Sequence, residues 1–302
     1  MTVIEARTGS PGLIAEGREL WRYRHLIRIL VERDLRVRYK NSVVGIGWTL
    51  INPLIQVFVL TIAIGYILGS GPKNLSAYIF CATIPWTFFQ TAVLDASTSV
   101  LVKMPLLKKV YFPREIPLIA TVCQNFIQFV ISLVIFVIYR WGVTTVLFHW
   151  PGPPPREIWL LPWLIAILFL LTLGTAFFVA AANVFYEDIK FILSLTLSFL
   201  FYLMPIIYFA ENIIYSTRIH SDSAKWWAYH LYLANPMAWL LTAFKQVFFG
   251  QAVISNFGAA QLLYSAPFDW RFLLLTTLTS LLVCGGGYAF FNSCKWKFTE
   301  RP

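Results

Sequence analysis

Long apolar stretches dominate the chain and are the main guide to its fold. The hydrocarbon core of a bilayer is about 30 Å thick, so a helix needs about 20 apolar residues to cross it. Stretches of about this length recur along the sequence, separated by shorter polar or proline-containing segments. We therefore expect an all-α, polytopic membrane protein with six transmembrane helices. The expected spans lie near residues 45–69, 77–99, 116–139, 159–182, 189–210 and 271–292.

A seventh apolar stretch, 226–249, differs from these six. It contains the polar residues Asn235 and Lys245, and Pro236 lies near its middle. Proline interrupts a helix because it lacks an amide hydrogen and clashes with the preceding turn. We interpret the segment 211–268 as re-entrant, with helices that enter the outer side of the membrane and return without crossing.

The distribution of basic residues supports an even number of crossings. The formal net charge is +10, and nine of the 24 Lys and Arg residues precede the first apolar stretch. Cytoplasmic segments of membrane proteins carry such an excess. Six crossings return the basic residues Lys295, Lys297 and Arg301 to the cytoplasm, whereas seven would place them outside. We expect both termini to be cytoplasmic.

The composition excludes several other classes of protein. A chain that is 58% hydrophobic and 13% charged has too much apolar surface for one water-soluble core. The positive charge is explained by its position beside the membrane, so no nucleic-acid partner is expected. The cysteines are far apart in apolar surroundings and form no metal-ligand pattern, so we expect no metal site.

An amphipathic pattern precedes the first apolar stretch. Residues 18–40 include eight basic and three acidic residues, and a surface with this excess of positive charge is attracted to anionic lipid. The sequence predicts a helix on the inner leaflet within a cytoplasmic region, 1–44, followed by a transmembrane domain, 45–302. Simple retention of basic residues on the cytoplasmic side is the alternative. The apolar residues on one side of this helix are Leu20, Tyr23, Ile27, Leu30 and Val31.

A short cytoplasmic segment, 103–113, separates the second and third spans. Pro105 suits the first turn of a helix, and Pro113 ends it. About two helical turns bearing basic and aromatic residues could insert into a groove on a cytosolic partner. From the residues alone, a solvated loop is the alternative.

The chain carries no motif that would supply its own energy. It has no GxxxxGK[ST] loop to cradle the phosphates of ATP. Asp95 is the only acidic residue in the six spans, which argues against an ion-driven carrier. We interpret the protein as a permease rather than an enzyme, with ATP hydrolysed by a separate subunit. The rival classes are a passive channel and a membrane enzyme that uses Glu211, Asp222 or Asp269 as an acid or base.

Aromatic and polar residues share faces on two of the spans. Sugar rings can stack on aromatic side chains while their hydroxyls bond to polar ones, so these faces are candidates for a substrate channel. Ordinary helix packing is the alternative. The candidates are Trp48, Asn52 and Tyr66 in the first span, and Ser198, Phe201, Tyr202 and Tyr208 in the fifth.

Two further features predict close contacts between helices. A polar seam in the third span is too costly to face lipid and must face protein or water. It comprises Thr121, Gln124, Asn125, Gln128 and Ser132. Small-residue patches at Gly65 and Gly69, and at Gly285–Gly287, would let helices approach closely, either within the chain or at a dimer seam.

Three motifs resemble those of a known family. Residues 33–48, RDLRVRYKNSVVGIGW, followed by Asn52-Pro53, resemble the opening pattern RDL-x-x-RYK…LG-x-x-W…P. Residues 108–115, KKVYFPRE, resemble KK-x-x-FPRE, and Asn235-Pro236 resembles an NP element before the last span. This pattern is similar to the membrane subunits of type-2 ABC exporters, especially those of lipid-linked O-antigen polysaccharide or wall teichoic acid. The resemblance covers about residues 20–300.

The resemblance implies a machine of several subunits. This chain would form a homodimer in the bacterial cytoplasmic (inner) membrane, bound to two copies of a cytosolic ABC ATPase. ATP and Mg²⁺ would bind to that partner, and this chain would hold no cofactor. The substrate would be a lipid-linked polysaccharide or teichoic acid, and the alternative is an ABC-type exporter of drugs or other lipids.

The resemblance also implies roles for particular segments. Residues 18–40 would be an interface helix, with Arg28, Arg33, Asp34, Arg38 and Tyr39 as its site residues. Segment 103–113 would be the main coupling helix, and 186–190 a smaller coupling element in which Glu187 departs from the expected basic residue. The coupling residues would be Lys108, Lys109, Tyr111, Phe112, Arg114, Glu115, Glu187 and Asp188.

Overall fold

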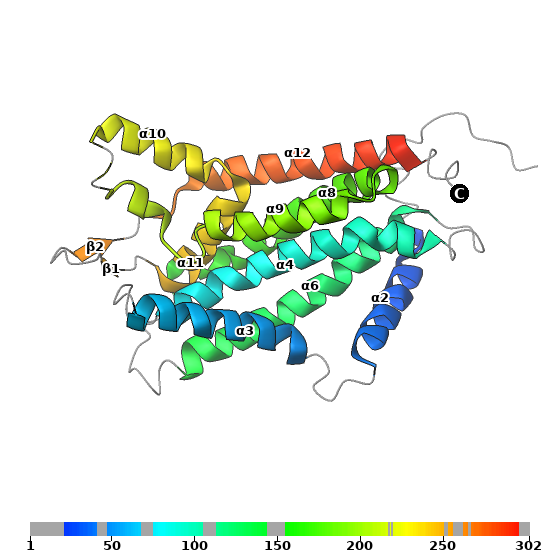
Figure 1. Cartoon of the computed structure of the whole chain (residues 1–302), viewed down its shortest axis with the longest axis horizontal. Coiled ribbons are helices and arrows are strands. Elements are labelled where there is room, and N and C mark those ends of the chain that lie inside the picture. The colour runs from blue at the N-terminus through cyan, green and yellow to red at the C-terminus, as the bar shows by residue number, and fades with distance from the viewer. Residues whose placement is uncertain are drawn as a thin grey trace, which may run out of the picture.

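The structure, a computed structural model, is predominantly helical (Figure 1). It describes residues 21–40, 47–67, 75–104, 113–143, 155–216, 218, 220–250, 253–255, 262–264 and 267–295. Its long helices are α2 (Arg24–Tyr39), α3 (Trp48–Thr61), α4 (Leu75–Val102), α6 (Glu115–Ile138), α8 (Leu161–Phe185), α9 (Ile189–Leu203), α10 (Asp222–Leu233), α11 (Pro236–Phe249) and α12 (Trp270–Cys294). Short elements extend or link them: the π-helical turns η2 (Ile62–Ile67) and η3 (Tyr139–Val143), the 3-10 turns η4 (Arg156–Leu160) and η5 (Ala210–Ile213), and the strands β1 (Val253–Ser255) and β2 (Leu262–Tyr264).

Each of the six expected spans coincides with a helix. Four helical stretches, 75–102, 115–142, 156–185 and 270–294, are long and apolar enough to cross a membrane. The other two expected spans coincide with shorter apolar helices, Ile51–Ile67 and Ile189–Leu203.

The fifth helix ends earlier than the apolar pattern predicts. The apolar residues continue to 210, but α9 stops at Leu203 and Met204 adopts an extended conformation with ψ of 153°. Met204 precedes Pro205, and the proline ring disfavours a helical conformation in the residue before it. The chain therefore leaves the helix axis at this point and continues into η5.

The expected re-entrant segment contains two helices and a hairpin. The Asn235 side chain accepts a hydrogen bond from the Met237 amide at 3.0 Å, and Pro236 occupies the first turn of α11. This is the favoured position for proline in a helix, so it begins α11 and separates it from α10. The antiparallel pair β1–β2 follows, with Val253 opposite Tyr264, and departs from a purely helical fold.

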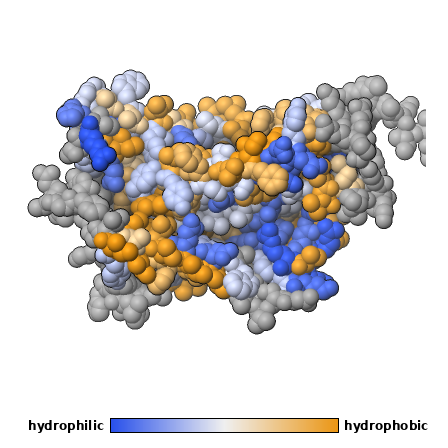
Figure 2. All heavy atoms as spheres, viewed as in Figure 1, coloured by the Kyte–Doolittle hydropathy of each residue, from blue (hydrophilic) through white to orange (hydrophobic). Residues whose placement is uncertain are grey.

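The main helices run back and forth along the long axis of the molecule (Figure 1). At one end, here named the α2 end, lie α2, the turn between α8 and α9, and the end of α12. At the other, the α10 end, lie α10, α11 and the hairpin. Figure 2 shows hydrophilic residues gathered over α2 and α10, with apolar residues over α3.

Helix α4 forms the centre of the bundle. It packs against α3, α6, α8, α9 and α11, and every residue from Ala77 to Trp86 is buried. A helix that is apolar on all sides can be accommodated only in such a position. Around it, the ring of Phe136 meets those of Phe80 and Phe248 edge to face, with centroids 5.6 and 4.9 Å apart.

Glycines allow α8 and α12 to touch backbone to backbone. A methyl group added to Gly174 would lie 2.5 Å from the Cα of Cys284, and one added to Gly287 would lie 2.2 Å from the Gly174 carbonyl oxygen. In contrast, Gly285 and Gly286 face open space. The glycine patch thus serves a contact within the chain through Gly287.

Replacing Gly174 should loosen this contact. We expect Gly174→Ala to destabilise the protein by about 1–3 kcal/mol, because the new methyl group meets backbone that has nowhere to move. Gly286→Ala is the matched control and should leave stability unchanged or raise it by up to about 1 kcal/mol, because alanine favours the helix. Thermal unfolding in detergent measures both. Equal melting temperatures for the two variants would contradict the close contact.

Candidate functional site

Helix α2 docks on the bundle through its apolar side. Leu30 and Val31 are buried against Ile116 and Ala120 at the start of α6. The basic residues lie largely away from this contact, as with Arg28, which is exposed and pairs with Glu32 of the same helix at 2.8 Å. The amphipathic helix expected within 18–40 is therefore present, and its apolar stripe meets protein.

An ion pair fastens the middle of α2 to the end of α4. The Lys103 Nζ lies 2.5 Å from one carboxylate oxygen of Asp34, and the Arg33 guanidinium lies 2.8 Å from the other. Burial raises the pKa of the Asp34 carboxyl, but the hydrogen bonds from Lys103 and Arg33 outweigh it, so the pKa lies below its ordinary value. Asp34 is therefore held as a carboxylate.

A second ion pair joins the end of α2 to both α4 and α6. The Arg38 guanidinium lies 2.5 Å from a carboxylate oxygen of Asp95, and the Asn125 side chain donates to the same oxygen at 3.0 Å. Arg38 also donates to the side-chain oxygens of Asn125 and Gln128, at 3.5 and 3.4 Å. Asn125 and Gln128 of the polar seam of α6 therefore face protein, one of the two environments expected for the seam, and Arg38 neutralises the acidic residue of α4.

A polar cavity opens beside this network. It has a volume of about 440 Å³ and lies between α2, α3, α4 and α6. It brings together two groups of residues that the sequence placed in separate roles: Arg38 and Tyr39 from the interface helix, and Trp48 and Asn52 from the channel candidates. Its remaining polar walls include Asp95, Asn125 and Gln128.

The channel candidate on η2 lies away from this cavity. Tyr66 is 83% exposed in η2, which continues from the end of α3 opposite Trp48. It shares the apolar surface of α3 and η2, where Phe58 is also exposed.

The candidates of the expected fifth span, on α9 and just after it, also divide between packing and surface. Phe201 is buried beside Trp86, with ring centroids 6.4 Å apart, whereas Tyr202 is exposed. The Ser198 hydroxyl donates to its own helix, and the Tyr208 hydroxyl bonds to that of Tyr232 on α10 at 3.1 Å. Within one chain the seven channel candidates therefore do not form a continuous lining.

The start of α6 is fastened to the end of α12. Glu115 is only 4% exposed and pairs with the Lys295 Nζ at 3.2 Å, while Arg114 donates to the Lys295 carbonyl oxygen. Two of the expected coupling residues thus also tie helices together within the chain. The others of that segment, Lys108, Lys109, Tyr111 and Phe112, lie outside the described residues.

The turn between α8 and α9 presents Glu187 and Asp188 at the surface. Asn183, which is fully buried, holds this turn in place. Its side chain accepts from the Lys190 amide and donates to the Ser97 carbonyl of α4, both at 3.0 Å. The exposed acidic pair is therefore carried by a firmly anchored turn at the α2 end.

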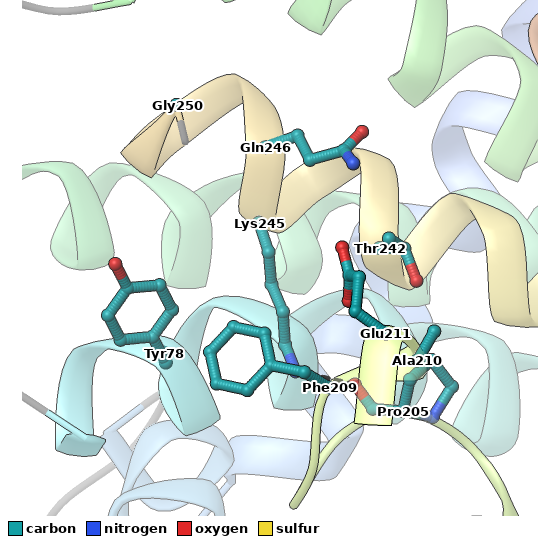
Figure 3. A pocket seen from close by; sticks show the side chains of 9 residues that line it. All are labelled: Tyr78, Pro205, Phe209, Ala210, Glu211, Thr242, Lys245, Gln246 and Gly250. Carbon is teal, nitrogen blue, oxygen red and sulfur yellow. Dashed lines mark hydrogen bonds between the residues drawn. The ribbon is translucent and has the colours of Figure 1, made fainter. Parts of the chain in front are cut away.

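In the sequence, Lys245 is notable only as a polar residue within an apolar stretch, and in the structure it is the most fully buried lysine described. It is 5% exposed, and its Nζ donates to the carbonyls of Pro205, Ile206 and Tyr208 at 2.6, 3.3 and 3.1 Å. Figure 3 shows it reaching from α11 past the Phe209 ring. The early end of α9 exposes these carbonyls, and an ammonium group has three donors with which to satisfy them. A lysine inside an apolar stretch was the available signal.

The carboxylates of the rival enzyme hypothesis have separate structural roles. Asp269 caps α12 by accepting from the Arg271 amide at 2.8 Å, and Asp222 is 97% exposed beside Lys225. Glu211 is buried and points toward α11 (Figure 3). In the described ranges, no three His, Cys, Asp or Glu side chains are grouped so as to hold a metal ion.

The docking of α2 should weaken in acid. Because the pKa of Asp34 lies below its unfolded value of about 3.9, its ion pair is complete above about pH 4 and is lost as the pH falls through the folded-state pKa. We expect Asp34→Asn to cost about 1–3 kcal/mol at pH 7 and progressively less in acid. Thermal unfolding in detergent from pH 7 to pH 3 measures this convergence.

The control for this experiment is Glu32→Gln, which removes only an exposed pair on the same helix and should cost less than about 0.5 kcal/mol. A difference between wild type and Asp34→Asn that stays constant at every pH would contradict the stated role of Asp34.

Comparison with known proteins identifies the family to which this chain belongs. Residues 25–249 match the family described as "ABC-2 type transporter". An O-antigen export system permease protein, RfbA, of Myxococcus xanthus is 29% identical over 233 residues, which cover 77% of this chain and 83% of that protein. Two RfbA proteins of Klebsiella pneumoniae, also named O-antigen export system permeases, are 22% and 23% identical over 277 residues, covering 91% of this chain and 94% of each.

The match to the family extends over more than half of the chain and includes α2, the polar cavity and α11. It confirms the resemblance drawn from the sequence motifs. The chain belongs to the ABC-2 type transporter family of membrane proteins.

Proposed function

We propose that this chain is the membrane subunit of an ATP-driven exporter that moves a lipid-linked, O-antigen-type polysaccharide across the bacterial inner membrane. The observation that carries this proposal is the similarity, over most of the chain, to three proteins named as O-antigen export permeases. Wall teichoic acid, the other polymer expected from the sequence, has no such support among these relatives.

The proposed topology has six crossings and places the α2 end in the cytoplasm. The main helices alternate in direction, so an even number of crossings puts α2 and the end of α12 on the same side (Figure 1). Both carry basic residues, as cytoplasmic segments do. Helix α2 then lies at the inner leaflet as the interface helix, and α10 and α11 form the re-entrant segment at the outer side.

In this proposal, the conformational change that drives transport begins at the α2 end. The chain has no ATP-binding loop, so a cytosolic ATPase must dock there, at segment 103–113 and at the anchored turn bearing Glu187 and Asp188. Segment 103–113 runs directly into Arg114 and Glu115, which bind the end of α12. Lys103, at its start, binds α2. A displacement of this segment would therefore reach three helices at once.

The proposed homodimer would enclose the conduit. Helices α3 and α9 each carry exposed apolar and aromatic residues, including Phe58, Tyr66, Leu195 and Phe199. These two faces of each chain can contact lipid, a second copy of the chain or the polymer. Pairing of two copies would bring the separate channel candidates of α3 and α9 to one seam. Two chains would then require two ATPase subunits.

Export should depend on the aromatic residues of the proposed coupling helix. We expect the double change Tyr111→Ala with Phe112→Ala to reduce surface polysaccharide at least tenfold, because these side chains would anchor in the ATPase. The permease should still insert in the membrane. Surface polysaccharide, measured in cells that lack the native permease gene and carry each variant, tests this.

Trp227→Ala provides the control, since it removes an exposed aromatic residue at the α10 end and should leave export near the wild-type level. Wild-type export by the double variant would contradict the coupling role.

A separate measurement tests the proposed substrate. If the ATPase turnover of the purified permease and ATPase responds to a drug but to no lipid-linked polysaccharide, the protein is a drug exporter and the proposed substrate is wrong.

A further inference from the structure

We propose that the cavity between α2, α3, α4 and α6 binds a sugar unit of the transported polysaccharide, before that sugar enters the conduit. This inference rests on the proposed function and adds a location and a recognition chemistry to it. The cavity volume of about 440 Å³ lies within the range of small-molecule sites, about 300–1,000 Å³.

The walls of the cavity combine the two kinds of group that a sugar needs. Its walls include Trp48 and Asn52, both exposed, and the half-buried Tyr39. Aromatic rings can cover the apolar face of a sugar ring, while amides, a carboxylate and a guanidinium offer donors and acceptors to its hydroxyls. Asp95, Asn125 and Arg38, which also line the cavity, supply those polar groups.

The charges of the cavity favour a neutral ligand over an anionic one. The guanidinium of Arg38 is already paired with Asp95 at 2.5 Å, and Asn125 donates to the same carboxylate. A diphosphate or a phospholipid headgroup would therefore meet a carboxylate beside Arg38, the only guanidinium among the described residues that line this cavity. Hydroxyl groups can instead accept from Arg38 and donate to Asp95 without disturbing the pair.

The amide of Gln128, which also lines the cavity, has a donor that the described residues leave unsatisfied. Its oxygen faces Arg38 at 3.4 Å, and this fixes the orientation of the amide because a guanidinium can only donate. Its nitrogen is consequently turned the other way, where it is buried and has no acceptor among the described residues. Buried donors in proteins are nearly always satisfied, so this nitrogen needs an acceptor that the described residues do not supply, an oxygen atom of water or of a ligand. An acyl chain would offer none.

The test uses the permease and its ATPase partner reconstituted in liposomes. The measured quantity is the concentration that gives half-maximal ATPase stimulation, for undecaprenyl-diphosphate-linked polysaccharide and separately for undecaprenyl diphosphate without sugar. The cavity variants are Gln128→Leu, which removes the unsatisfied donor, and Asn52→Ala, which changes an exposed lining residue and should have little effect on folding. Gln124→Leu is the matched control, one turn away on α6 and outside the cavity lining.

We expect both cavity variants to raise the half-maximal concentration of the lipid-linked polysaccharide at least fivefold, with a maximal rate within twofold of wild type. Their response to undecaprenyl diphosphate should not change, and Gln124→Leu should match wild type in both assays. Unchanged half-maximal concentrations in both cavity variants would overturn the sugar site while leaving the proposed export function in place. An equal shift for undecaprenyl diphosphate would also overturn it, because the cavity would then recognise the lipid carrier.

A different result would overturn the proposed function itself. If the wild-type complex responds to no lipid-linked polysaccharide, the substrate class is wrong, and the sugar site fails with it. The two failures are distinguishable. Failure of the proposed function is measured with the wild-type complex alone, whereas failure of the sugar site alone is measured only with the variants.

Discussion

The structure depends on the requirement that every charge carried into an apolar bundle must be paired or hydrogen-bonded. At the α2 end this requirement is met by Arg38, whose guanidinium binds Asp95 of α4 and the polar seam of α6. Without Arg38, burial of the Asp95 carboxylate in a transmembrane helix would cost free energy. Without Asp95, the Arg38 guanidinium would lose hydration with no charged partner to compensate. Together they fasten a surface helix to two helices of the bundle and form the floor of the polar cavity.

The same requirement explains the arrangement at the α10 end. Pro205 ends α9 early and leaves three backbone carbonyls without helical partners, and Lys245 of α11 satisfies them. The cost of burying an ammonium group is offset because each of its donors finds an acceptor. Helix α11 is thereby locked to the segment after α9, so the two parts of the proposed outer gate cannot separate without exposing these groups.

The two ends thus have complementary roles in the proposed exporter. At the α2 end, ion pairs link α2, α4, α6 and α12 into a unit that a cytosolic ATPase could displace. At the α10 end, short helices and turns replace long spans, which suits a region that opens and closes. Between them, α4 is buried along much of its length and connects the two ends mechanically.

The sequence predicted the helices well, because hydrophobic length is a strong signal and the membrane sets its scale. It also predicted that the polar seam of α6 would face protein or water rather than lipid. It missed the end of α9 at Leu203, although Pro205 was the available signal. It did not distinguish Gly287 from its neighbouring glycines, since consecutive helical residues point in different directions and only one of them meets Gly174.

The cavity and the partners of Lys245 were beyond reach of sequence reasoning for a different reason. Each joins elements that are far apart in the chain: Arg38 and Gln128 are 90 residues apart, and Lys245 and Pro205 are 40 residues apart. Local periodicity assigns a side chain to a face of its helix but does not identify the helix opposite. The channel candidates illustrate this, because Trp48 and Asn52 share a cavity with α2 rather than with the candidates of α9.

A double-mutant cycle on Arg38 and Asp95 tests the central claim most directly. Thermal unfolding in detergent would be compared for wild type, Arg38→Gln, Asp95→Asn and the double variant. If this pair fastens α2 to the bundle, each single change should destabilise the protein, and the double change should cost less than their sum by about 0.5–3 kcal/mol. Strictly additive effects would mean that the two side chains act independently, and the account of α2 as a helix fastened by charge pairing would be wrong.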